Sequence, residues 1–266
     1  PVVGSAQGDA DAYRVVLAIV KGASRVQMQV DLKDLVAKFP LAYDRFHAVS
    51  YGSLLNNIPL FSGTALEDAE LGQLPFVFDA FKTAGFATFY GEDGCKPRST
   101  VLRFSPSHID QRLASECCAK RHFTPDEDRR CPGPNRPTDT QAVLSSARAF
   151  AQANPHSFIA VNVGTALVED QSLLGSIRDD VAAFVGEELA RPGSVVILTS
   201  DAGSAPEALD EQASMIVSKL SPLYMSHGRL ATGIVSPYDV HRTLLHLAAL
   251  DVPPAVGGVI PAAPAA

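Results

Sequence analysis

The sequence predicts an α/β fold in which helices cover both faces of a mostly parallel central sheet. The first observation is a set of short, continuous apolar runs rich in β-branched residues, at 13–20, 158–163 and 194–199. Such runs are typical of parallel strands buried on both faces. The second observation is the order helix, glycine, strand at 76–84, Gly85 and 86–90. This order is the repeating unit of a parallel sheet, so both observations indicate the same class.

The other elements continue the alternation of helices and strands. Apolar residues with helical spacing predict further helices at 28–39, 140–153, 173–189 and 237–250. Pro40 ends the first of these, and Pro237 stands in the first turn of the last. Weaker patterns predict a helical turn at 54–58 and short strands at 46–50 and 215–217.

The length of 266 residues suits one large α/β domain or two small ones. We expect a single domain over 1–252, followed by a Pro/Ala-rich tail at 253–266. The region 92–137 interrupts this domain as a polar, proline-rich insertion of loops, with one helix expected at 109–118.

The four cysteines all fall within this insertion, and their spacing matches no standard zinc signature. Cys117 and Cys118 are adjacent, so each is expected to pair elsewhere, in disulfides with Cys95 and Cys131. Such disulfides would staple a loop-rich segment and indicate a secretory compartment. The alternative is four reduced thiols in a cytosolic protein.

The formal net charge of -7 argues against nucleic acid or an anionic membrane surface as a partner. The basic residues at 120–130 alternate with acidic ones, which is typical of a solvated loop. No apolar run approaches the roughly 18 residues of a membrane-spanning helix. Hydrophobic residues make up 46% of the chain, which is enough for a sizeable core.

Candidate functional residues follow the predicted strands, because active sites on parallel sheets lie at the carboxyl ends of the strands. Lys21 follows the first strand, Ser53 the second and Asp201 a late one. Asp201 is either a metal ligand or the turn former that Asp commonly is before small residues and glycine. The histidines are scattered and form no HxH or HxxxH pair, which is a poor supply for a metal cluster.

Ser53, Asp201 and His241 also occur in the chain order of the catalytic triad of α/β-hydrolases. The sharp turn at such a nucleophile needs glycine two residues before and two residues after the serine, but Tyr51 and Leu55 stand there. His241 falls within a predicted helix, whereas a triad histidine usually lies on a loop. A metal-free serine hydrolase is therefore the third of the functions considered.

Segments taken in chain order resemble one family. The stretch 52–63 resembles the nucleophile region of sulfatase-like proteins in the alkaline phosphatase superfamily. The stretches 81–93, 195–203 and 230–244 are similar to the Glu-Asp, Ser-Asp-His-Gly and Thr-x-Pro segments of an uncharacterised, largely secreted branch. The resemblance is collinear over about 13–250. It implies a three-layer sandwich, ester hydrolysis at a metal centre, and a location outside the cell or in the lumen of the secretory pathway.

Some functional positions of that family are retained. Ser53 matches the nucleophile, which is a Thr, a Ser or a modified Cys in the family. Asp201 matches the Asp of a late Asp-His metal pair. Ser24 and Arg25 match the end of an Asp-x-x-Ser-Arg pattern that follows the first strand.

Other metal positions of the family are lost. Lys21 stands where the first metal-binding Asp is expected, and Ala202 replaces the His of the late pair. A mid-chain Ser-His pair of the family falls on Gly164 and Thr165, so a second His is missing. Divalent metals in such sites are held by anionic oxygens and neutral imidazoles, so these changes imply a degenerate metal site.

The leading interpretation is a pseudoenzyme, a degenerate sulfatase-like domain serving as a binding or structural module of an extracellular protein. No cofactor is then expected. Lys21 and the amides near Ser53 would offer a site for an anionic ligand, and a protein is the other partner considered. We also hypothesise a salt bridge between Lys21 and Asp201. The alternative is an active hydrolase of sulfate or phosphate esters, with Ser53 as nucleophile and zinc or calcium bound by Asp201.

Overall fold

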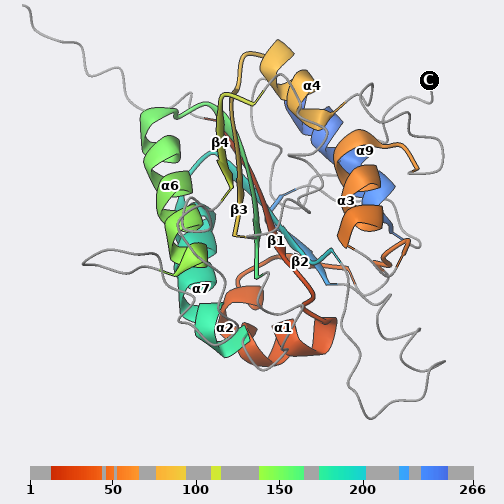
Figure 1. The fold of residues 1–266 in the computed structure, drawn as a ribbon, viewed down its shortest axis with the longest axis vertical. Coiled ribbons are helices and arrows are strands. Elements are labelled where there is room, and N and C mark those ends of the chain that lie inside the picture. The colour runs from red at the N-terminus through yellow and green to blue at the C-terminus, as the bar shows by residue number, and fades with distance from the viewer. Residues whose placement is uncertain are drawn as a thin grey trace, which may run out of the picture.

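The computed structural model describes residues 13–43, 46–50, 53–65, 76–93, 109–114, 138–164, 174–201, 222–227 and 235–250. These residues form one seven-stranded sheet with helices on both faces (Figure 1). The strands are β1 Arg14–Val20, β2 Leu41–Ala42, β3 Ala87–Glu92, β4 Gln111–Ala114, β5 Ser157–Val163, β6 Ser194–Thr199 and β7 Leu223–Met225. The helices are α1 Arg25–Asp31, α2 Lys33–Val36, α3 Ser53–Ser62, α4 Val77–Thr83, α6 Asp139–Ala153, α7 Leu174–Ala190 and α9 Pro237–Ala248.

The strands lie in the spatial order β2-β7-β6-β1-β5-β3-β4. The run from β6 to β4 is parallel, whereas β7 pairs antiparallel with β6, and β2 pairs antiparallel with β7. The predicted class, an α/β fold with a mostly parallel sheet, is confirmed. The carboxyl ends of β6, β1, β5 and β3 lie side by side as a result.

The central strand β1 explains why its sequence is apolar without interruption. Successive side chains of a strand point to opposite faces of the sheet. Leu17 and Ile19 pack into the core beneath α3, α4 and α9, whereas Val16 and Ala18 pack into the core beneath α1, α2, α6 and α7. Both faces of the sheet are therefore covered, and the molecule has three layers (Figure 1).

The helix predicted at 109–118 is wrong over its described part, 109–114, because Gln111–Ala114 forms strand β4. β4 pairs in parallel with β3, so the edge of β3 supplies the backbone partners that favour an extended conformation. Asp110 fixes the entry to β4: its carboxylate accepts a hydrogen bond from the backbone N–H of Thr88 at 2.9 Å. The backbone N–H of Asp110 donates in return to the carbonyl of Thr88 at 3.1 Å.

The helix predicted at 28–39 begins earlier and is divided into α1 and α2. Ser24 and Gln27 form a reciprocal capping box that starts α1 at Arg25. Leu32 then leaves the helical region, with φ at -112°, and ends α1. Among the described residues, the predicted strand at 46–50 is reduced to a single bridge between Phe46 and Val235.

Several predictions lie outside the described residues. They concern the strand at 215–217, the loop at 120–130, the tail at 253–266, and the disulfides of Cys95, Cys117, Cys118 and Cys131. They stay predictions.

Candidate functional site

One edge of the sheet gathers charged and polar residues from four neighbouring strands. Asp201 follows β6, Lys21 follows β1 and Gly164 follows β5, while Glu92 ends β3 and Asp93 follows it. Parallel strands place their carboxyl ends at the same edge, so residues far apart in the chain become neighbours there. The sequence predicted that Lys21 and Asp201 lie at strand ends of one sheet edge, and the structure places both there.

Lys21 forms a buried ion pair with Glu92. Nζ of Lys21 lies 2.5 Å from Oε1 of Glu92, and each of the two side chains is 7% exposed. The hydroxyl of Tyr90 donates to Oε2 of the same carboxylate at 3.0 Å. The hypothesised salt bridge between Lys21 and Asp201 is wrong, because the described carboxylate that binds Lys21 is Glu92. Only β5 separates β1 from β3, a distance that a lysine and a glutamate side chain span together.

Asp201 is buried at the end of β6 and is bound on one side only. Its Oδ1 accepts a hydrogen bond from the backbone N–H of Gly22 at 3.1 Å. Gly22 has a φ of 67°, a left-handed conformation that favours glycine at this turn. Oδ2 of Asp201 and Oδ1 of Asn162 are buried and lack a hydrogen-bond partner within the described part of the chain. Two polar oxygens at this edge therefore remain unsatisfied by the described residues.

Gly164 takes part in a second junction between strand ends. Its φ is 92°, again in the left-handed region, and its backbone N–H donates to Oδ2 of Asp93 at 2.6 Å. The hydroxyl of Thr140, in the first turn of α6, donates to the same oxygen at 2.7 Å. Gly164 therefore has a structural role at the place where the resembling family has its Ser-His pair. Thr165 lies outside the described residues.

Helix α3 begins at Ser53 beside this edge, and Asn56 holds the segment that precedes it. Oδ1 of Asn56 accepts hydrogen bonds from the backbone N–H groups of Val49 and Ser50, at 2.8 and 3.0 Å. Nδ2 of Asn56 donates to the carbonyl of Ser50 at 2.8 Å. The predicted nucleophile position is thus the first residue of a helix, although the side chain of Ser53 lies outside what the structure describes.

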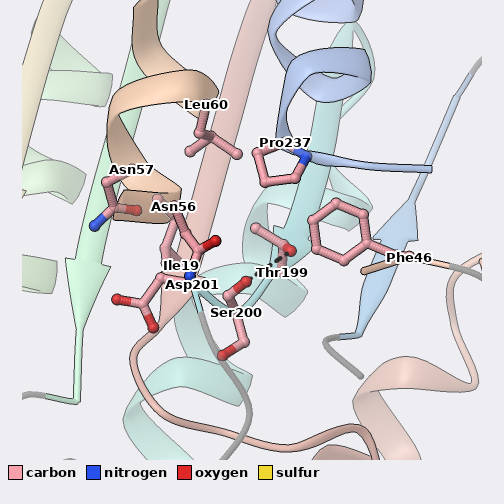
Figure 2. A pocket seen from close by; sticks show the side chains of 9 residues that line it. All are labelled: Ile19, Phe46, Asn56, Asn57, Leu60, Thr199, Ser200, Asp201 and Pro237. Atoms are coloured by element: carbon pink, nitrogen blue, oxygen red, sulfur yellow. Dashed lines mark hydrogen bonds between the residues drawn. The ribbon is translucent and has the colours of Figure 1, made fainter. Parts of the chain in front are cut away.

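A cavity of about 10 Å³ lies between α3 and the end of β6. Asp201 and Asn57 line one side of it, and Phe46 and Pro237 line another (Figure 2). This volume is close to that of a single water molecule. Between α3 and the end of β6, the described residues therefore leave room for a water molecule and not for a substrate.

His241, the third member of the hypothesised triad, is bound elsewhere. Its Nδ1 lies 3.3 Å from the carbonyl oxygen of Leu60 in α3. The structure shows no hydrogen bond between His241 and Asp201, both of which it describes, whereas a triad needs such a bond to orient the imidazole. Burial lowers the pKa of His241 to about 4, so the ring is neutral near pH 7. Its position favours a role in packing α9 against α3.

No protein-family model and no curated protein matches the sequence. Solved structures do match it. The C-terminal periplasmic domain of EptC from Escherichia coli, in complex with Zn, gives a TM-score of 0.59 at 14% identity, covering 89% of this chain and 81% of that one. A protein in the alkaline phosphatase superfamily from Vibrio parahaemolyticus gives 0.59 at 10% identity, covering 96% and 71%.

Alkaline phosphatase from the Antarctic bacterium TAB5 gives a TM-score of 0.61 at 13% identity, covering 89% of this chain and 97% of that one. The fold is that of the alkaline phosphatase superfamily. The resemblance of the sequence segments is thereby confirmed at the level of the fold, and the three-layer arrangement agrees with it (Figure 1).

The described residues at this edge of the alkaline phosphatase fold do not fit a divalent metal. Among them, no group of three or more His, Cys, Asp and Glu side chains could hold an ion. Glu92 is engaged by an ammonium and a phenol, and one oxygen of Asp93 by an amide and a hydroxyl. Zinc sites in proteins usually have four ligands, and a single open oxygen on Asp201 falls short of that. Ala202 lies outside the described residues.

Glu92 and Tyr90 also lie at this edge, and the sequence analysis assigned neither of them a role in the site. Glu92 ends a strand of this edge, just as Asp201 follows one, so the strand-end rule could have selected it. Tyr90 lies two residues earlier on the same face of β3, which follows from the period of two in a strand. Nothing in the sequence indicated that Glu92 binds both Tyr90 and Lys21.

Proposed function

We propose that this chain is a catalytically degenerate domain with the alkaline phosphatase fold, which serves as a binding or structural module. The observation that carries the proposal is the buried ion pair between Lys21 and Glu92. It fixes a positive charge at the strand end where the resembling family has a metal-binding Asp. Like charges repel most strongly where the surroundings have a low dielectric constant, so a dication is disfavoured beside this ammonium.

The same ion pair bears on the nucleophile position. A serine hydroxyl is a weak nucleophile unless a base or a metal ion activates it. Under this proposal Ser53 faces no Lewis acid, and His241 is occupied by the carbonyl of Leu60. The position would then be a serine at the start of a helix without a catalytic role.

The partner under this proposal is a protein. Lys21 was expected to bind an anionic ligand, but its ammonium is buried and already paired with a carboxylate. An anion would have to break that pair before it could bind there. The domain would extend over 1–252, in an extracytoplasmic location, as the periplasmic domain of EptC has. None of the described helices is long and apolar enough to cross a membrane.

An active metal-dependent hydrolase of phosphate or sulfate esters is the second candidate. Oδ2 of Asp201 favours it, because a buried carboxylate oxygen without a hydrogen-bond partner is uncommon and a bound cation would satisfy it. The EptC domain was solved with Zn, and a TAB5 alkaline phosphatase variant with Mg. Zinc or calcium would here need ligands from residues beyond the described ones.

Metal analysis combined with an esterase assay tests the proposal. Wild-type protein, incubated with zinc, calcium and magnesium and then desalted, is compared with Ser53→Ala for hydrolysis of p-nitrophenyl phosphate and p-nitrophenyl sulfate. We expect no stoichiometric metal and equal, background rates for the two proteins. Stoichiometric metal, with turnover abolished by Ser53→Ala, would establish the second candidate instead. Turnover that survives a chelator and is lost in His241→Asn would point to the metal-free serine hydrolase.

A further inference from the structure

The ion pair of Lys21 and Glu92 links two strands that are not adjacent in the sheet. Lys21 leaves the end of β1, Glu92 ends β3, and β5 lies between them. On one side of β5, Asn162 is opposite Glu92; on the other side, the backbone N–H of Lys21 donates to the carbonyl of Val163 at 2.8 Å. The ammonium therefore bridges the edge of the sheet across β5.

Both oxygens of the Glu92 carboxylate are occupied by groups of this chain. Oε1 takes the ammonium of Lys21 at 2.5 Å, and Oε2 takes the hydroxyl of Tyr90 at 3.0 Å. The side chain of Glu92 is only 7% exposed, and a carboxylate that far from water needs a counter-charge. Lys21 is the cation that the structure supplies for it.

The ion pair is also anchored in the aromatic core. The ring of Tyr90 packs edge-on against Phe61 of α3 and Phe78 of α4, with ring centroids 5.9 and 6.1 Å apart. Phe61 and Phe78 stack on each other at 5.7 Å. The charge on Lys21 is thus connected, through Glu92 and Tyr90, to the packing of the helix that begins at Ser53.

We propose that Lys21 is a built-in counter-ion, which neutralises Glu92 and so makes the folding of this edge independent of any divalent metal. The inference rests on the proposed function, in which no dication binds here. It goes further in assigning a defined task to the lysine at the degenerate position. Lys21 is in this view a required structural cation and not merely a substitution that abolishes metal binding.

Thermal unfolding of four proteins tests this proposal, each with a chelator and with added zinc, calcium or magnesium. They are the wild type, Lys21→Met, the double variant Lys21→Met with Glu92→Leu, and Lys82→Met as the matched control. Lys82 also pairs with a carboxylate, that of Asp110, but its side chain is 44% exposed. The control therefore removes a lysine from a solvent-exposed ion pair.

The wild-type Tm should be the same with a chelator and with divalent metals. Lys21→Met should lower the Tm by about 10 °C, since it leaves a buried carboxylate unpaired, and Lys82→Met by no more than about 3 °C. The double variant should recover part of the loss, because it removes the unpaired charge as well. If Lys21→Met does not fold, a cooperative transition in the double variant supports the proposal in its place.

A wild-type Tm that falls with chelator would overturn the proposal, since the edge would then depend on a metal. So would a Lys21→Met variant no less stable than Lys82→Met, or a double variant no more stable than Lys21→Met. The same wild-type samples are assayed for ester hydrolysis. The wild type could hydrolyse an ester, lose that activity in Ser53→Ala, and yet have the same Tm with and without chelator. This result would contradict the proposed pseudoenzyme but not the counter-ion role of Lys21.

Discussion

The two ends of strand β1 each carry a buried cation, and they use it differently. At the amino end, Nη1 of Arg14 binds both carboxylate oxygens of Glu188, at 2.9 and 3.1 Å. Nε of Arg14 donates to Ser157 at 3.2 Å, and Nη2 donates to the carbonyl of Ala151. Ser194 donates to Glu188 as well, at 3.2 Å. This network saturates the guanidinium from several elements.

At the carboxyl end, the ammonium of Lys21 forms an ion pair with one oxygen of Glu92. Nearby, Oδ2 of Asp201 and Oδ1 of Asn162 are buried and lack hydrogen-bond partners in the described structure. A guanidinium is a rigid fork of donors, whereas an ammonium is a compact point charge. The comparison teaches that the amino end satisfies its buried charges from several elements, whereas the carboxyl end keeps two buried oxygens without a partner among the described residues.

Removing Arg14 should produce the largest loss of stability. Arg14→Met leaves Glu188 buried without its counter-charge, which should lower the free energy of unfolding by about 4 kcal/mol. Urea denaturation measures this change. The matched control is Arg148→Met, which breaks the exposed ion pair with Glu187 and should cost about 1 kcal/mol or less. Equal losses in the two variants would refute a special role for the amino-end network.

Acid should act on the helix layer above the carboxyl end and leave the charge of Arg14 unchanged. The pKa of His241 is about 4 in the folded protein, against 6.5 when unfolded, because burial disfavours the imidazolium. The folded protein is therefore most stable above pH 6.5, where His241 is neutral in both states. As the pH falls from 6.5 towards 4, the free energy of unfolding should decrease by about 3 kcal/mol in total.

Chemical denaturation between pH 7 and pH 4 measures this loss. In His241→Asn the residue is neutral at every pH, so stability should fall less steeply over the same interval. Burial also lowers the pKa of His156 and of His227, so the variant should keep part of the slope. An unchanged slope in His241→Asn would contradict the assignment of acid sensitivity to the contact between α9 and α3.

A pair of glycines gives the smallest predicted difference. Gly63 and Gly85 both have positive φ, 69° and 88°, so alanine is strained at either position. A Cβ on Gly63 would lie 2.6 Å from the ring of His241, whereas a Cβ on Gly85 would meet nothing within 4 Å. Gly63→Ala should cost about 2 kcal/mol and Gly85→Ala about 1 kcal/mol, measured by urea denaturation. Equal costs would mean that His241 moves aside freely.

The sequence predicted those strands that are apolar on both faces. The runs at 13–20, 158–163 and 194–199 correspond to β1, β5 and β6, because burial on both faces leaves its mark on every residue. Strand β4 was predicted as a helix, since Gln111–Ala114 has no such run and becomes extended only by pairing with β3. The two- and three-residue strands β2 and β7 are too short to show a period.

The candidate site was predictable as far as chain order allowed. Asp201 and Lys21 were selected because each follows a strand, and the structure places both at the carboxyl edge of the sheet. Glu92 was not paired with Lys21, because strand order in space, β6-β1-β5-β3, differs from strand order in the chain. Which carboxylate an ammonium reaches depends on that spatial order, which local sequence patterns do not encode.

The decisive measurement is the metal content of the wild-type protein, determined by mass spectrometry after incubation with zinc, calcium and magnesium and removal of free ions. The ion pair of Lys21 and Glu92 predicts substoichiometric metal, with the same value in Asp201→Asn. One equivalent of a divalent metal in the wild type, lost in Asp201→Asn, would contradict this interpretation of the carboxyl edge.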